Sequence, residues 1–174
     1  ADASGEAIGY KGEVVFPVVV VPADASQPVG LKVRFEYGVC REICIPAEAS
    51  HALELPAKLP AALPATLAAA LASVPADVAR PGAGLPTIVE QRVGAGRIEL
   101  VLAYPKGTAG ADLFVEAPDG LYIPLPKRID APKPGQVRYA IEFGAAEAAQ
   151  LKGKTLTLTM VSDAASSTAR LAMP

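Results

Sequence analysis

The chain has little sulfur and little imidazole. Only two cysteines, two methionines and one histidine occur among its 174 residues. A single histidine disfavours histidine-based catalysis, since such sites pair a base with a nucleophile and an orienting group. The sequence also lacks G-x-S-x-G, H-E-x-x-H and a glycine-rich phosphate loop that opens a helix. The common hydrolase and nucleotide-binding signatures are therefore missing.

Charge clusters and long hydrophobic runs are absent as well. The 16 basic and 18 acidic residues give a formal charge of -2, and the basic ones are scattered. This distribution lacks the electrostatic footprint of a nucleic-acid binder. The longest apolar runs, residues 14–21 and 67–74, fall short of the roughly 20 residues of a spanning helix. We therefore expect no nucleic-acid partner and no direct membrane insertion of this segment.

What the sequence has instead is strand patterning. In LKVRFEY, residues 31–37, apolar and charged residues alternate with the period of a half-buried strand. ASHALEL, residues 49–55, alternates again and places His51 on the side of its leucines. EVVFPVVVV, residues 13–21, is rich in β-branched residues, and its proline predicts an edge strand or a bulge. The two alternating segments flank both cysteines, which predicts a hairpin.

Composition divides the chain into three parts. Residues 59–84 are rich in alanine and proline and predict a connector with a short helix at ATLAAALASV. Residues 85–174 contain seven strand-like segments separated by turns, one of them LYIPLP at residues 121–126. This pattern is typical of an immunoglobulin-like sandwich, which we interpret as a binding or spacer module. Residues 1–58 have too few strands to close a sandwich, which predicts upstream sequence or docking of the hairpin on the rest. The predicted fold class is all-β, with immunoglobulin-like β-sandwiches.

The aromatic residues of the last part are predicted to be core residues. They are Tyr104, Phe114, Tyr122, Tyr139 and Phe143.

The two cysteines stand in YGVCREICIPAE, residues 37–48. Residues four apart in a strand are separated by about 13 Å, whereas a disulfide needs Cα atoms within roughly 7 Å. Cys40 and Cys44 can therefore bond only across a turn. Arg41 and Glu42 are compatible with such a turn, and Pro46 favours extended geometry just after it.

Three interpretations of the pair stay open from the residues alone. A structural staple would contribute only about 2 kcal/mol for a loop of about five residues. A metal site would use Cys40, Cys44 and His51 for Cu(I) or Zn(II), although no fourth ligand is evident and a lone histidine beside leucines is more often a packed residue. A redox-active pair is the third, because a short surface disulfide is easily reduced and exchanged.

The segments IGYKGEVVFPVVV and YGVCREICIPAEA together resemble a known family. They are similar to the N-terminal periplasmic domain of DsbD-type thiol:disulfide interchange proteins, and more closely to the ScsB-like branch linked with copper tolerance, over about residues 6–55. The resemblance implies a sandwich in which Cys40 and Cys44 are the catalytic pair of a protein thiol-disulfide oxidoreductase without a bound cofactor. It also implies electron transfer from a membrane-embedded redox domain, of the same or another chain, to periplasmic thioredoxin-fold proteins.

Members of this family shield their cysteines with an upstream cap loop that carries an aromatic residue and acids. GEAIGYKGE occupies that place, with Ile8 where the cap aromatic is expected and Tyr10 as the nearest aromatic. Glu6 stands where an acid is expected, and Glu13 matches in kind. With Glu48, these two acids are the candidate proton acceptors. The turn of three residues between the cysteines is shorter than in the better-known members.

Exchange requires one accessible sulfur that can become a thiolate. Arg41 would favour the thiolate and Glu42 would oppose it. We expect Cys40 to be the attacking sulfur, because Cys44 lies in the apolar run ICIP.

The predicted function is an exported thiol-disulfide relay in the periplasm. Two expectations fit the start of the sequence: a targeting peptide has been removed, or the segment belongs to a longer protein that tethers it to the inner membrane. Two alternatives remain. One is a periplasmic copper-binding or chaperone-like sandwich that uses the same two cysteines, and the other is a purely structural adhesion-type sandwich.

Overall fold

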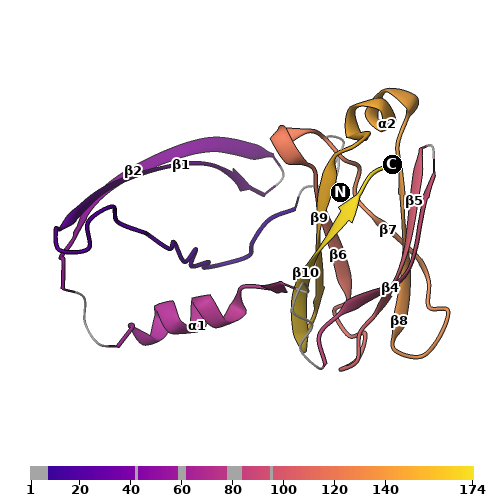
Figure 1. The fold of residues 1–174 in the computed structure, drawn as a ribbon, viewed down its shortest axis with the longest axis horizontal. Helices are drawn as coiled ribbons and strands as arrows, with labels where there is room; N and C mark the ends of the chain where they lie inside the picture. Colours follow the sequence, from indigo (N-terminus) through magenta and orange to yellow (C-terminus); the bar gives the residue numbers. More distant parts are fainter. Residues whose placement is uncertain (1–7, 42, 59–61, 78–83, 95) are drawn as a thin grey trace. The chain divides into compact units, whose positions relative to one another are not determined.

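Strands dominate the computed structural model, which describes residues 8–41, 43–58, 62–77, 84–94 and 96–174 (Figure 1). The chain divides into two compact units, Ala1–Ala72 and Ser73–Pro174. Strand content, sandwich-like layers and two short helices confirm the predicted all-β, immunoglobulin-like fold class. Within the described ranges, no helix is both long and apolar enough to cross a membrane.

The first unit is built around one antiparallel hairpin. Strand β1 (Val29–Cys40) pairs with β2 (Cys44–Leu55) in a continuous register that runs from Val29 opposite Leu55 to Cys40 opposite Cys44. The period-2 alternation of the sequence predicts both strands, and the hairpin is confirmed. Helix α1 (Ala65–Ser73) follows, with its first backbone hydrogen bond from Ala68 N–H to the carbonyl of Pro64. The predicted connector helix is therefore also confirmed.

The strand predicted at residues 13–21 is wrong, because this segment has no strand structure. Pro17 has no N–H to donate to a ladder, and Val18, Val19 and Val21 are exposed rather than packed on a sheet. High β-propensity describes residues that fit a pleated, half-buried surface, and without a pairing partner it does not produce a strand.

The second unit is a sandwich of two four-stranded sheets (Figure 1). One sheet has the order β3-β10-β9-β6 and the other β4-β5-β8-β7. All pairs are antiparallel except β3 with β10. The strands are β3 (Ala76–Asp77), β4 (Thr87–Gly94), β5 (Arg97–Ala103), β6 (Asp112–Glu116), β7 (Lys127–Asp130), β8 (Gln136–Glu142), β9 (Thr155–Ser162) and β10 (Ala165–Ala172), with a 3-10 helix at Pro118–Gly120 and α2 at Ala145–Leu151.

The core of this unit lies between its two sheets. Alternate residues of each strand point inward, so that β5 and β8 contribute one half of the core and β6, β9 and β10 the other. These side chains are nearly or fully buried and form one cluster. Its central members are Ile98, Leu100, Leu102, Leu113, Val137, Tyr139, Ile141, Leu156, Leu158, Met160 and Leu171.

Two predictions for this unit are wrong in part. Residues 121–126 form no strand, because the two prolines in LYIPLP remove ladder donors, and pairing with β8 begins only at Lys127. Of the five aromatic residues predicted in the core, Tyr104, Tyr139 and Phe143 are buried and Phe114 is half-buried. Tyr122 is 72% exposed, since its neighbours Leu121 and Ile123 pack against the core from the opposite side of the extended chain.

Candidate functional site: the hairpin disulfide

The two cysteines form a disulfide across the tip of the β1–β2 hairpin. Cys40 ends β1, Cys44 begins β2, and their Cα atoms are 4.0 Å apart. The Arg41 N–H donates to the carbonyl of Ile43 within the connecting turn. The prediction that the pair bonds across a turn is therefore confirmed.

Pro46 helps to explain why the ring closes at this register. Gly38 lies opposite Pro46, two residues along each strand from the cysteine pair. A hydrogen-bonded antiparallel pair needs both N–H groups, and proline has none, so Gly38 and Pro46 form a non-hydrogen-bonded pair. Hydrogen-bonded and non-hydrogen-bonded pairs alternate along the strands, and the cysteine pair is two positions away. Cys40 and Cys44 therefore also form a non-hydrogen-bonded pair. In such pairs the Cα atoms lie closer together, at about 4.5 Å.

The disulfide lies at the protein surface. Both cysteines are exposed, and the flanking Ile43 and Ile45 are 70% and 59% exposed. An incoming thiol can therefore reach the pair. The isoleucines do not bury Cys44, so the choice of Cys40 as the attacking sulfur stays a prediction.

The cysteines share their hairpin face with charged residues. Directly opposite residues of an antiparallel pair lie on one face, and alternate positions follow them. Inward from the disulfide this face carries Gly38 and Pro46, then Glu36 opposite Glu48. Arg34 donates to Glu48 across the strands at 2.7 Å and contacts Glu36 at 3.2 Å.

His51 lies on the opposite face of the hairpin, which corrects the three-ligand metal interpretation. It pairs with Val33, and its ring lies 6.2 Å from that of Phe35 in an edge arrangement. His51 is seven positions after Cys44 in the sequence. An odd number of positions places two side chains on opposite sides of a strand. Among the residues that the structure describes, no group of three or more potential ligands gathers to hold a metal ion.

The cap candidates are exposed in the segment before β1. Ile8 is 60% and Tyr10 73% exposed, and the Tyr10 ring contacts Phe16 edge-to-face at 5.4 Å. Glu13 is exposed, and Glu6 lies outside the described residues. A shielding role for Ile8 or Tyr10 stays a prediction. The contact with Phe16 was not anticipated from sequence, because only a folded segment brings residues six positions apart together.

Glu48 is the proton-acceptor candidate whose position relative to the cysteines is defined. It lies on the cysteine face, four residues after Cys44, which corresponds to about 13 Å along a strand. Its carboxylate accepts a hydrogen bond from Arg34. The residues Gly38, Glu36 and Arg34 were not singled out from the sequence, although the same period-2 parity places all three on the side of Cys40.

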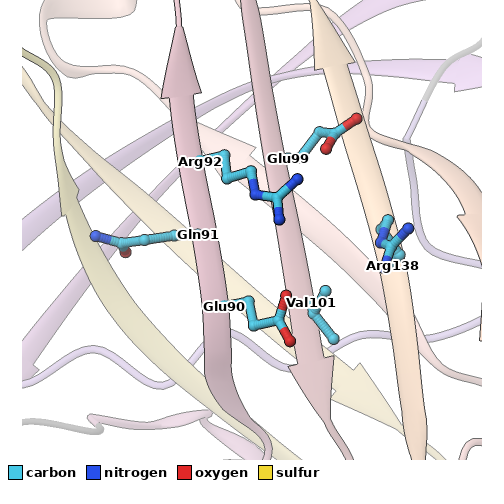
Figure 2. Close-up of a pocket in the computed structure, with 6 residues that line it drawn as sticks. All are labelled: Glu90, Gln91, Arg92, Glu99, Val101 and Arg138. Atoms are coloured by element: carbon cyan, nitrogen blue, oxygen red, sulfur yellow. The ribbon is translucent and has the colours of Figure 1, made fainter. Parts of the chain in front are cut away.

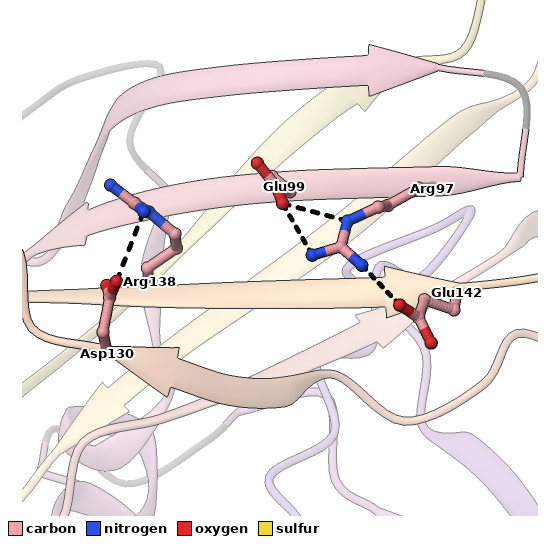
Figure 3. Close-up of polar contacts among 5 residues, drawn as sticks. All are labelled: Arg97, Glu99, Asp130, Arg138 and Glu142. Carbon is pink, nitrogen blue, oxygen red and sulfur yellow. Dashed lines mark hydrogen bonds and ion pairs between the residues drawn. The ribbon is translucent and has the colours of Figure 1, made fainter.

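A second polar area covers the outer face of the β4-β5-β8-β7 sheet. A small pocket is lined there by Glu90, Gln91, Arg92, Glu99, Val101 and Arg138, and Figure 2 shows Gln91 directed away from the others. Arg97 binds both Glu99 and Glu142, and Arg138 binds Asp130 (Figure 3). The hydrogen bond from Arg97 lowers the pKa of Glu99. The opposite charges in this area therefore compensate one another.

An accessible disulfide across the tip of a β-hairpin defines a class: β-rich proteins with a surface disulfide between two paired strands. The comparison with known families specifies it further. Residues 1–56 match the family described as thiol:disulfide interchange protein DsbD, N-terminal, a segment that includes both strands of the hairpin and both cysteines. The predicted resemblance to DsbD-type proteins is confirmed for this part of the chain, and the closer resemblance to the ScsB-like branch stays a prediction. No curated protein and no solved structure matches the chain.

Proposed function

We propose that the protein carries out thiol-disulfide exchange through Cys40 and Cys44, as a protein-disulfide reductase type of oxidoreductase. The observation that supports this most is an exposed disulfide whose two cysteines face each other at the tip of a hairpin, inside the segment that matches the interchange family. A disulfide with a structural role would be expected to join distant segments. Closing a loop of about five residues adds only about 2 kcal/mol to the free energy of unfolding.

The exchange proceeds in two substitutions at sulfur. A thiolate of a reduced dithiol partner attacks Cys40 Sγ, a bond forms between the two proteins, and the Cys40–Cys44 bond breaks to release the Cys44 thiolate, which takes up a proton. The second partner thiol, on losing its proton, attacks the partner sulfur of the mixed disulfide and releases Cys40 as a thiolate. The partner leaves as a disulfide, and two electrons have passed to this protein. The reverse sequence delivers them to the next partner.

The surroundings of the pair support this chemistry. Arg41 in the turn is exposed, and its positive charge favours the thiolate form of either cysteine, which offsets the opposing charge expected from Glu42. Of the acids proposed as proton acceptors, Glu48 is paired with Arg34, while Glu13 is exposed. The ion pair makes Glu48 a weaker acceptor, and Glu6 and Glu13 stay candidates for this role. The exposed tip also leaves solvent water as an acceptor.

The cellular setting follows the family resemblance. The electron donor is a membrane-embedded redox domain and the acceptors are thioredoxin-fold proteins in the periplasm. Residues 1–58 would contribute to the redox sandwich, residues 59–84 would connect it to the rest, and residues 85–174 would serve as a binding or spacer module. This division into three parts belongs to the proposal.

Trapping of a mixed disulfide tests the proposal. Cys44→Ser leaves Cys40 able to form an adduct that this chain cannot resolve. A thioredoxin-fold protein that keeps only its attacking cysteine, supplied as a mixed disulfide with a small thiol, should lose that thiol to Cys40 attack and give a covalent complex on non-reducing gels. Cys40→Ser is the matched variant and should give little adduct. Adducts through Cys44 alone would reverse the assignment of the attacking sulfur, and no adduct in either variant would contradict exchange.

Redox titration with Cu(I) competition separates exchange from the copper-binding alternative. A reduction potential within reach of thioredoxin-fold partners supports exchange. Tight Cu(I) binding by the reduced pair together with sluggish exchange would support the copper module.

A further inference from the structure

Gly38 is the residue next to the disulfide on the cysteine face of the hairpin. It is exposed, and it lies two positions before Cys40 on β1. A β-carbon built on Gly38 would lie 3.7 Å from Cys40 Sγ and 3.9 Å from Cys44 Cβ. The missing side chain therefore leaves one flank of Cys40 Sγ uncovered.

Neither of the usual structural reasons for a glycine applies at this position. Gly38 is not among the residues with positive φ, so its backbone suits any residue. Contacts of 3.7 Å and 3.9 Å are ordinary van der Waals distances, so a β-carbon would fit. Gly96 shows the contrast, with φ of 87° and a β-carbon position 2.9 Å from the carbonyl oxygen of Phe143. A glycine inside a strand weakens the strand and often marks a place where another backbone approaches closely.

The protein surface beside the Gly38–Pro46 pair is also recessed. Pro46 helps to line a depression that continues inward along the hairpin. Glu36 and Glu48, on the cysteine face, line it as well, and Tyr37 and Ala47 line it from the edge of the opposite face. A partner chain that crosses the hairpin here would meet the disulfide on one side and this depression on the other.

We infer that Gly38 is a specificity-determining residue, which leaves room for the cysteine-bearing backbone segment of a protein partner to reach Cys40 Sγ. The inference rests on the proposed exchange function and adds to it the site of partner approach. The step is the first substitution: the partner thiolate forms a bond to Cys40 Sγ while the bond to Cys44 Sγ breaks, and Cys44 leaves as a thiolate. A side chain at position 38 would obstruct a bulky protein nucleophile much more than a small dithiol.

Stopped-flow reduction of the full chain by two reductants tests the inference. The probes are reduced thioredoxin, as a thioredoxin-fold protein, and dithiothreitol, as a small dithiol. Gly38→Val should lower the second-order rate constant with thioredoxin by about tenfold or more, since small misplacements of reacting atoms cost up to about a hundredfold. The rate constant with dithiothreitol should change by less than about threefold, because a small dithiol can still align its sulfur with Cys40 Sγ beside the added side chain. Thermal stability should not fall, because valine favours strands.

Gly30→Val is the matched control. Gly30 lies on the same strand and the same face, its φ is not positive, and a β-carbon there would meet nothing within 4 Å. Both rate constants should match those of the original chain. If Gly38→Val fails to fold, Gly38→Ala adds only the β-carbon and should still slow thioredoxin selectively.

The outcomes separate the inference from the function on which it rests. Unchanged thioredoxin rates in the folded position-38 variants would overturn the inference and leave exchange standing. Equal slowing with both reductants would overturn it too, because the residue would then act on the disulfide itself. An original chain that reacts with dithiothreitol but not with thioredoxin would overturn both.

Discussion

The hydroxyls of Tyr104 and Tyr139 are the most deeply buried titratable groups of the sandwich. Each residue is 1% exposed, and the hydroxyls donate to the carbonyls of Asp112 and Ala111 at 3.0 Å. Burial raises the pKa of both tyrosines, because the charged phenolate would lose its hydration. Both residues therefore hold their protons in the folded protein at pH values where the unfolded chain releases them.

This difference predicts destabilisation at high pH. The contribution of the two tyrosines is fully present below their unfolded pKa of about 10. Above it, the unfolded state binds fewer protons than the folded state, so the free energy of unfolding should fall by up to about 1.4 kcal/mol per pH unit for each tyrosine. Urea unfolding curves measured between pH 8 and the alkaline range check this expectation.

Substitution by phenylalanine isolates the contribution. Tyr139→Phe should lower stability at neutral pH by about 1 kcal/mol through the lost hydrogen bond, and should make the loss above the unfolded tyrosine pKa less steep. Tyr122→Phe is the control, because Tyr122 is 72% exposed and should leave the whole pH profile unchanged. An unaltered alkaline slope in Tyr139→Phe would contradict the assignment.

Sequence reasoning succeeds for residues whose chemistry depends on near neighbours. Chain geometry alone predicts that Cys40 and Cys44 can bond only across a turn, because residues four apart in a strand are too distant to bond. His51 could not be placed relative to them with the same security until the register fixed its face. Phe16 and Tyr10 show the same difficulty, because their ring contact depends on an irregular segment that no periodicity describes.

At the scale of elements, the turn between β4 and β5 depends on Gly96. Its φ is 87°, a region that disfavours residues with a β-carbon, and a β-carbon there would lie 2.9 Å from the carbonyl oxygen of Phe143. Gly96 also accepts a hydrogen bond from the Phe143 N–H, which ties the turn to the end of β8. Gly96→Ala should therefore destabilise the protein by about 2 kcal/mol or more, from backbone strain plus displacement of that contact.

Gly153→Ala separates these two causes. Gly153 has a φ of 69°, but a β-carbon there would meet nothing within 4 Å. Its substitution should cost only the backbone strain, about 1 kcal/mol. Equal losses for the two variants in thermal or urea unfolding would show that the contact with Phe143 contributes nothing.

Most elements could be predicted from periodicity, and the failures have identifiable causes. Alternation predicts β1 and β2 because each strand has one half-buried or apolar face. Residues 13–21 and 121–126 have the right composition but contain prolines and lack ladder partners. Strand β3 is two residues long and exists only through its parallel pairing with β10, so no local pattern can reveal it.

At the scale of the whole molecule, the hydrophobic core and the reactive site belong to different parts of the chain. The buried core cluster is drawn from residues 98–173, in the second unit, whereas the disulfide closes a hairpin in the first. Many apolar side chains of that hairpin are exposed, including Phe35, Tyr37 and Val39. The buried core and the disulfide are therefore formed by separate segments.

This separation predicts that reduction of the disulfide changes the hairpin and leaves the sandwich core intact. Amide hydrogen exchange on the full chain, with and without dithiothreitol, measures both at once. Amides of β1 and β2 should lose protection on reduction, because the short loop is no longer closed covalently. Amides of β5, β8 and β9 should keep theirs, since each strand is paired on both sides within its own sheet and lines the core cluster. A Cys40→Ser, Cys44→Ser double variant should reproduce the reduced pattern without reductant. Loss of protection in β5, β8 and β9 on reduction would show that the disulfide stabilises the sandwich, and would favour a structural role for the pair over a redox one.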